Sequence, residues 1–212
     1  MGNHLIKEEL NTLFKRGKSN QERVIFTKNK IYNAVIISLD EHGYSETSVN
    51  RIQEIAGVSR GALTHHFPSK EEMIAQTLER ILTLNKDNKS KNEKYDLIKT
   101  KGFEINLQRI WKKVIDTVEG RALVEILIAS RTDRKLKNRI QPELHKFNVE
   151  INKEFCVLYS SIKNSKEEII VLWTICRTFL RGLHIQINFE DEKFNPDPVM
   201  KKFIEIMKPF FN

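Results

Sequence analysis

The chain of 212 residues carries 36 Lys and Arg against 28 Asp and Glu, a formal net charge of +8, with only 8 Gly and 5 Pro. This length can bury a core without disulfide or metal support, and long stretches that lack Gly and Pro favour helices over a turn-rich β fold. The positive charge suits a polyanionic partner, nucleic acid or an anionic membrane, although many proteins with similar charge have neither.

Several classes of protein are disfavoured. Cys156 and Cys176 both lie in apolar helical patterns without Cys-x-x-Cys spacing, which argues against a zinc site or a disulfide framework. This use of cysteine predicts that the protein resides in the reducing cytoplasm. No stretch approaches the ~18 apolar residues of a membrane span, and residues 1–10 lack a signal-peptide core. Gly-rich phosphate loops, His-Glu-x-x-His and Gly-x-Ser-x-Gly motifs are missing, so an enzyme is a distant alternative. The polar faces of the C-terminal helices argue against a membrane-surface protein, which is a further distant alternative. We expect no cofactor and no metal.

The N-terminal part begins with an extension and a long helix. Residues 1–20 form either a short amphipathic helix or a poorly ordered tail. A helix is predicted over 21–41, and Gly43 ends it. Its apolar stripe comprises Val24, Ile31, Val35 and Leu39, flanked by Ile25, Ala34 and Ile36.

Short helices follow. One is predicted over 48–55, capped by Thr47 or Ser48, and the turn 56–58 contains Gly57, which tolerates a left-handed backbone. Ser59 caps the next helix, which runs to about His65. A fourth helix starts at Ser69, with Glu72 completing a capping box. The core shared by the first three helices is predicted to contain Ile52, Ile55, Val58, Leu63 and Phe67.

The helix after Gly57 would present small or hydrogen-bonding side chains outward. Such a surface suits insertion into a DNA major groove, although any three-helix core needs similar packing beneath it. The outward residues are Ser59, Arg60, Gly61, Ala62, Thr64 and His65.

The residues themselves are more specific than the spacing. The run Gly-Tyr-Ser-Glu-Thr-Ser-Val at 43–49, then Ala-Gly-Val-Ser at 56–59, then Gly-Ala-Leu-Thr-His-His-Phe-Pro-Ser-Lys-Glu at 61–71 closely resembles the tetracycline-repressor (TetR) family. The matching motifs fall within residues 24–80. It implies an all-α homodimeric repressor of operator DNA, with an N-terminal three-helix helix-turn-helix domain and a larger C-terminal helical domain for ligand binding and dimerisation.

The resemblance also implies roles for individual positions. Thr47 and Ser48 would touch backbone phosphate, and Asn50 would reach a base. His66 and Lys70 would contact phosphate, in addition to the recognition helix residues given above. Thr64 stands where the family usually has an aromatic residue, and Gln53 where it favours alanine.

Basic residues near the first helix either extend the phosphate footprint or form a solvated basic tail. They are Lys15, Arg16, Lys18, Arg23, Lys28 and Lys30.

We divide the chain into an extension (1–20), a DNA-binding domain (21–68), a connecting helix and linker (69–94) and a ligand-binding and dimerisation domain (95–212). Helices of the last are predicted over 95–117, 119–130, 134–162, 165–188 and 196–210, with Pro142 kinking the third or marking its start. The last two helices are predicted to form the homodimer interface as an isologous four-helix contact.

Polar or aromatic residues within these apolar helices are candidates for an effector pocket, although core packing is the alternative for each. Arg177 and His184, seven residues apart, share a helix face that suits an anion or an interface salt bridge. The candidates are Phe103, Trp111, Arg131, His145, Phe155, Trp173, Arg177 and His184. The sequence therefore predicts a repressor released from double-stranded operator DNA by an unknown small molecule, with a constitutive DNA-binding protein of the same fold as the alternative.

Overall fold

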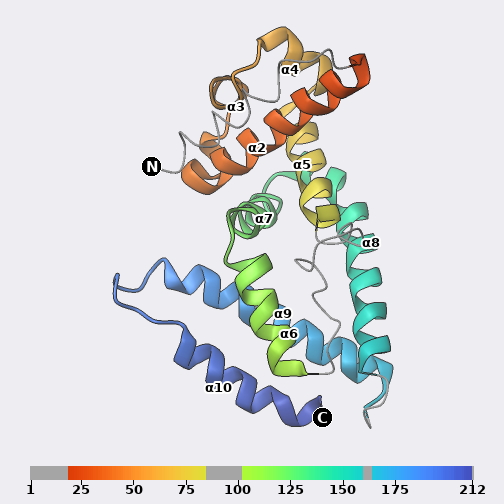
Figure 1. Cartoon of the computed structure of the whole chain (residues 1–212), viewed down its shortest axis with the longest axis vertical. Helices are drawn as coiled ribbons and strands as arrows, with labels where there is room; N and C mark the ends of the chain where they lie inside the picture. The colour runs from red at the N-terminus through yellow and green to blue at the C-terminus, as the bar shows by residue number, and fades with distance from the viewer. Residues whose placement is uncertain (1–18, 85–101, 160–163, 212) are drawn as a thin grey trace.

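The computed structural model describes residues 19–84, 102–159 and 164–211, and within these ranges it contains helices and no strand. This confirms the predicted all-α fold. The N-terminal helices are α2 (Asn20–Glu46), α3 (Val49–Ala56), α4 (Arg60–His66) and α5 (Lys70–Leu84). They occupy one end of the molecule, and α10 lies at the opposite end (Figure 1). The predicted helix within 1–20 lies outside the described residues.

Serine hydroxyls start these helices by accepting hydrogen bonds from free backbone N–H groups. Ser48 accepts from the N–H of Arg51 at 3.2 Å, Ser59 from Ala62 at 3.2 Å, and Ser69 from Glu72 at 3.1 Å. The cap of α3 is therefore Ser48 and not Thr47. The expected capping box at Ser69 is half realised, because the Glu72 carboxylate instead binds Arg139 and Gln76.

Two glycines adopt the left-handed backbone that other residues rarely enter. Gly43, with φ of 71°, interrupts α2 where the sequence predicts its end, although helical hydrogen bonding resumes to Glu46. Gly57, with φ of 60°, ends α3 and donates its N–H to the carbonyls of Gln53 and Glu54. This turn lets α4 start across the end of α3.

The C-terminal helices are α6 (Phe103–Ile110), the π turn η1 (Trp111–Ile115), α7 (Val118–Ala129), α8 (Arg134–Leu158), α9 (Lys166–Ile187), α10 (Asp197–Met207) and the 3₁₀ turn η2 (Lys208–Phe210). The helix predicted over 95–117 is thus shorter and ends in a π turn, and residues 95–101 lie outside the described ranges. Pro142 neither starts nor ends α8, which passes through it.

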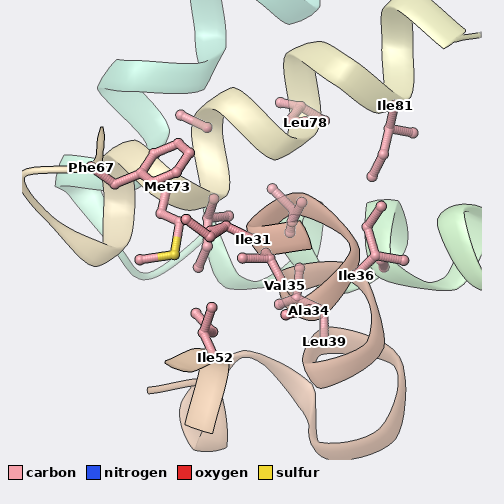
Figure 2. Packing of buried hydrophobic residues seen from close by; sticks show 14 of the residues in the cluster. Ile31, Ala34, Val35, Ile36, Leu39, Ile52, Phe67, Met73, Leu78 and Ile81 are labelled. Carbon is pink, nitrogen blue, oxygen red and sulfur yellow. The ribbon is translucent and has the colours of Figure 1, made fainter. Parts of the chain in front are cut away.

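The first of two hydrophobic cores lies under the helix-turn-helix. Figure 2 shows Ile31, Val35 and Leu39 of α2 between Ile52 of α3 and residues of α5. The predicted core residues Ile52, Leu63 and Phe67 are buried, and Ile55 and Val58 pack against them in part. This core also takes in residues of α7 and α8: Ala122, Leu123, Ile126, Leu136 and Ile140.

The second core joins α6, η1, the end of α8, α9 and α10. Phe155 stacks on Trp173 with 3.9 Å between ring centroids, Phe103 stacks on Phe211 at 4.2 Å, and Phe179 stacks on Phe203. Because α7 and the start of α8 belong to the first core, the packing boundary does not coincide with the linker in the sequence. The two parts of the chain share a broad contact.

Gly120 in α7 is required by a close approach of backbones. A Cβ at this position would lie 2.2 Å from the carbonyl oxygen of Ile115 and 2.3 Å from that of Val114. Glycine thus lets the first turn of α7 press against the π turn. This contact fixes α7 relative to η1.

Candidate nucleic-acid interface and effector cavity

Helix α4 presents one face to solvent and one to the core. Leu63 is 1% exposed and fills the core, whereas Arg60, Gly61, Thr64 and His65 are exposed. Ser59 is also exposed, and Ala62 and His66 are half-buried. The exposed face carries a guanidinium, an imidazole and little bulk, which is the composition that reads base edges in a major groove.

Nothing in the fold itself demands glycine at position 61. A Cβ built there meets no atom within 4 Å, and the residue is an ordinary helical one. Glycine costs a helix interior roughly 0.5–1 kcal/mol relative to alanine. The fold therefore gives no reason for glycine at this position, and the absence of a side chain leaves this face of α4 open to close approach.

Two more of the predicted residues are exposed, namely Ser48 at the N-cap of α3 and Asn50 within α3. Thr47 differs from the expectation. It is fully buried, and its hydroxyl lies 2.9 Å from that of Ser38 and donates to the carbonyl of Gly43 at 2.7 Å. Its side chain therefore holds the end of α2 and does not face the DNA side, which corrects the phosphate contact predicted for it.

Lys70 is half-buried at the start of α5. Its Nζ donates to the carbonyl oxygen of Tyr44 at 2.7 Å and lies 4.1 Å from the centre of the Tyr44 ring, and burial lowers its pKa. An ammonium has three N–H donors, so donors remain for a phosphate. Lys70 thus has a structural role that sequence reasoning missed, besides the predicted one.

Histidine and basic side chains lie close to one another at the end of α4. The rings of His65 and His66 are 5.0 Å apart, and Lys28 lies 5.8 Å from the ring of Phe67. Burial, followed by repulsion from His65 and Lys28, lowers the pKa of His66. Of the predicted basic residues, Arg23 is exposed and Lys28 and Lys30 are half-exposed, whereas Lys15, Arg16 and Lys18 lie outside the described ranges.

A cavity opens among α6, η1, α7, α8 and α9. Its interior volume is about 70 Å³, and the empty space counted through its open mouth into solvent is about 660 Å³. Its walls are Ile110, Val114, Ile115, Leu123, Phe147, Ile151, Phe155, Trp173, Arg177, Leu180 and Arg181.

Comparison with known proteins matches the helix-turn-helix region to one family. The sequence model described as "Bacterial regulatory proteins, tetR family" matches residues 31–77, which span most of α2, all of α3 and α4, and half of α5. The HTH-type transcriptional regulator CymR of Pseudomonas putida is 26% identical over 196 residues, which cover 90% of this chain and 94% of CymR. The chain thus carries the DNA-binding region of the TetR family of bacterial regulatory proteins.

Other similar proteins are also transcriptional regulators. IcaR of Staphylococcus aureus strain Newman, a negative transcriptional regulator of the icaADBC biofilm operon, is 25% identical over 174 residues, 78% of this chain and 86% of IcaR. A transcriptional regulator from Rhodococcus sp. Rha1 shares the fold with a TM-score of 0.65 at 16% identity, covering 86% of this chain and 95% of that one.

Within this TetR-family fold, the structure places the candidate pocket residues in two groups. Phe155, Trp173 and Arg177 line the cavity. Arg131 and His145 are exposed, Phe103 stacks on Phe211, and Trp111 packs edge-on against the buried His184. These last five residues do not line the cavity, because packing or the helix ends place them elsewhere.

Sequence reasoning paired Arg177 with His184, whereas the structure pairs it with Arg181. Arg177 and Arg181 are four residues apart on α9 and both line the cavity. The i, i+4 spacing of two arginines on an otherwise apolar helix was the available signal. His184 instead lies in the core.

Polar bridges connect the helix-turn-helix to the C-terminal helices. Arg121 of α7 forms a bidentate ion pair with Asp40 of α2, with Nη2 3.0 Å from Oδ2. Arg139 of α8 binds Glu72 at 2.7 Å and Glu79 at 2.7 Å, both on α5. The α5 and α2 helices are therefore each tied to a different C-terminal helix.

Two further searches covered the described ranges. No helix there is long and apolar enough to cross a membrane. No group of three or more His, Cys, Asp or Glu side chains in those ranges is arranged to hold a metal.

Proposed function

We propose that this chain is a homodimeric repressor of transcription that binds operator DNA through α4 and is released when a small molecule occupies the cavity. The observation that carries the proposal is the exposed face of α4, with Arg60, Gly61 and His65 presented over a rigid core. IcaR, which is similar to this chain, is a negative transcriptional regulator, and this similarity supports a repressor over an activator.

The roles of single residues follow from their exposure. Arg60 and Asn50 would read base edges, since arginine pairs with guanine and asparagine with adenine in the major groove. Side chains at the rim of this face would form hydrogen bonds with the DNA, namely Ser48, Ser59, Thr64, His65 and His66. Lys70 would contact phosphate with its remaining N–H donors. Gly61 and Ala62 would permit close approach.

Dimerisation is supported by an apolar stripe on the outer face of α9. Val171 is 58% exposed and Ile175 45% exposed, and Ile185 continues the stripe about three turns further along the helix. Gly182 lies on it with no atom within 4 Å of an added Cβ, so a second helix can approach closely. Val199 and Ile206 expose apolar surface on α10, which Figure 1 places beside α9.

Transmission from the cavity to the DNA face would pass through α7. Leu123 lines the cavity and also belongs to the core beneath the helix-turn-helix. A ligand that displaces Leu123 changes the packing of α7 against α2, and with it the spacing of the two recognition helices in a dimer. The ligand shifts this equilibrium only by its difference in affinity for the two arrangements.

Selection from a library of random DNA duplexes tests the proposal. We expect the full-length protein to enrich a sequence with two-fold symmetry and half-sites one DNA turn apart, ~34 Å. Enrichment of nothing over the starting library, at low ionic strength and with a folded dimer, would contradict it. Specific binding that no small molecule alters in a ligand screen would favour the constitutive alternative.

A further inference from the structure

The polar groups in the cavity wall are all hydrogen-bond donors. Among its lining residues only Trp173, Arg177 and Arg181 carry polar side-chain atoms, and the indole and guanidinium groups donate without accepting. The other lining side chains are apolar. Among the described residues, the wall thus contains no carboxylate, amide or hydroxyl.

Two of these donors are buried without a partner. Trp173 Nε1 and Arg181 Nε make no hydrogen bond within the described ranges. Buried donors normally find a partner, because an unpaired one retains the whole cost of leaving water. Asn152 Oδ1 and His184 Nδ1 also lack partners, but neither residue lines the cavity.

The two arginines carry uncompensated charge. Arg177 donates to the neutral side chain of Asn148, and in the described part of the chain neither arginine has an ion-pair partner. Burial lowers the pKa of Arg177, and burial together with repulsion from Arg177 lowers that of Arg181 to about 10. Both therefore remain cationic at neutral pH in an apolar wall.

We propose that the cavity binds a small apolar carboxylate, whose anionic oxygens accept hydrogen bonds from Arg181 and Arg177 and whose hydrocarbon or aromatic part lies between Phe155 and Leu123. This proposal rests on the proposed function, because it names the chemical class of the effector. A carboxylate supplies the acceptor atoms and the negative charge that the wall lacks. Neutral or cationic molecules of the same shape leave the charge of the arginines uncompensated.

Calorimetric titration with paired probes tests the proposal on the full-length protein. The probes are octanoate, 4-phenylbutyrate and 1-naphthoate, each compared with its own amide. We expect at least one carboxylate to bind ten-fold or more tightly than its amide. Arg181→Gln should remove that preference, Arg181→Lys should retain part of it, and the exposed control Lys153→Gln should leave it intact. Melting temperatures of all variants establish that each is folded.

The outcomes separate this inference from the function on which it rests. If no carboxylate binds more tightly than its amide, or if Arg181→Gln keeps the full preference, the carboxylate site is wrong. Release of the selected DNA duplex by a neutral or cationic compound would preserve the proposed function and overturn the carboxylate site. A carboxylate that binds through Arg181 but leaves DNA affinity unchanged supports the site and contradicts effector-driven release.

Discussion

The hydroxyl of Tyr44, at the end of α2, donates a 2.5 Å hydrogen bond to the carboxylate of Asp133, which caps α8 through the N–H of Leu136. The backbone N–H of Tyr44 also donates to Glu125 of α7 at 3.3 Å, and its carbonyl accepts from Lys70. One residue thus connects the DNA-binding helices to both α7 and α8. It raises the stability of the contact through which a bound effector would act.

Tyr44→Phe should weaken this connection without removing the ring that Lys70 covers. The change deletes one hydrogen bond to a charged acceptor, and we expect a loss of about 1–2 kcal/mol in the free energy of unfolding. Chemical denaturation measures this loss, and duplex release by an identified effector should need a different effector concentration. An unchanged unfolding free energy and an unchanged release curve would show that the hydrogen bond between Tyr44 and Asp133 does not couple the DNA-binding helices to α8.

Gly120→Ala should destabilise the fold strongly. Its Cβ would lie 2.2 Å from a carbonyl oxygen, so η1 and α7 must separate at a cost of roughly 1–3 kcal/mol or more. Gly61→Ala is the matched control, because the same substitution in open space should leave thermal unfolding unchanged or slightly raise its midpoint. Equal melting of the two variants would contradict the close approach assigned to Gly120.

The same Gly61→Ala variant should lose affinity for the selected duplex. The added methyl group lies on the exposed face of α4 that we propose approaches the bases, where a sub-ångström displacement affects every contact. We expect a loss of at least ten-fold in gel retardation while circular dichroism stays that of the parent. Retention of full affinity would mean that this part of α4 does not approach DNA closely.

Ile175→Glu should dissociate the dimer. It places a carboxylate in the exposed stripe on α9, where a partner helix would bury it unpaired at a cost of several kcal/mol. Analytical ultracentrifugation should show monomers, whereas Gln141→Glu, the same charge change on exposed α8, should remain dimeric. A dimeric Ile175→Glu protein would place the interface elsewhere.

DNA affinity should rise as the pH falls from 8 to 6. In the free protein the pKa of His66 lies below its ordinary value, so the ring is neutral at pH 8. A nearby phosphate favours the protonated form, so the complex takes up a proton that the free protein lacks, and acid favours binding. His66→Gln should flatten this dependence in fluorescence anisotropy titrations, and an undiminished dependence would assign it to another group.

The helix-turn-helix could be predicted from the sequence because residues close to one another along the chain determine it. Ser48, Ser59 and Gly57 specify where helices begin and end, and the spacing of Ile52 and Leu63 specifies which faces are buried. The prediction for Thr47 was wrong for a tertiary reason. Its hydroxyl bonds Ser38, nine residues earlier, which no periodicity indicates.

The residues that line the cavity could be predicted from the sequence only in part. Aromatic residues on amphipathic helices are common to cores and pockets, so Phe103 and Phe155 looked alike although one stacks in the core and the other lines the cavity. Which of them faces empty space depends on how α6, α8 and α9 are set relative to one another. The π turn at Trp111–Ile115, which shapes one wall, had no recognisable sequence signal.

The most direct test of the central claim compares Arg60→Ala with His145→Ala, an exposed histidine on α8 remote from α4. Affinity for the selected duplex and for a scrambled duplex is measured for both variants and the parent over a range of salt concentrations. The structure predicts that Arg60→Ala lowers the ratio of the two affinities by ten-fold or more, about 1.4 kcal/mol at the least, while His145→Ala leaves it unchanged. An unchanged ratio for Arg60→Ala would contradict sequence reading by α4.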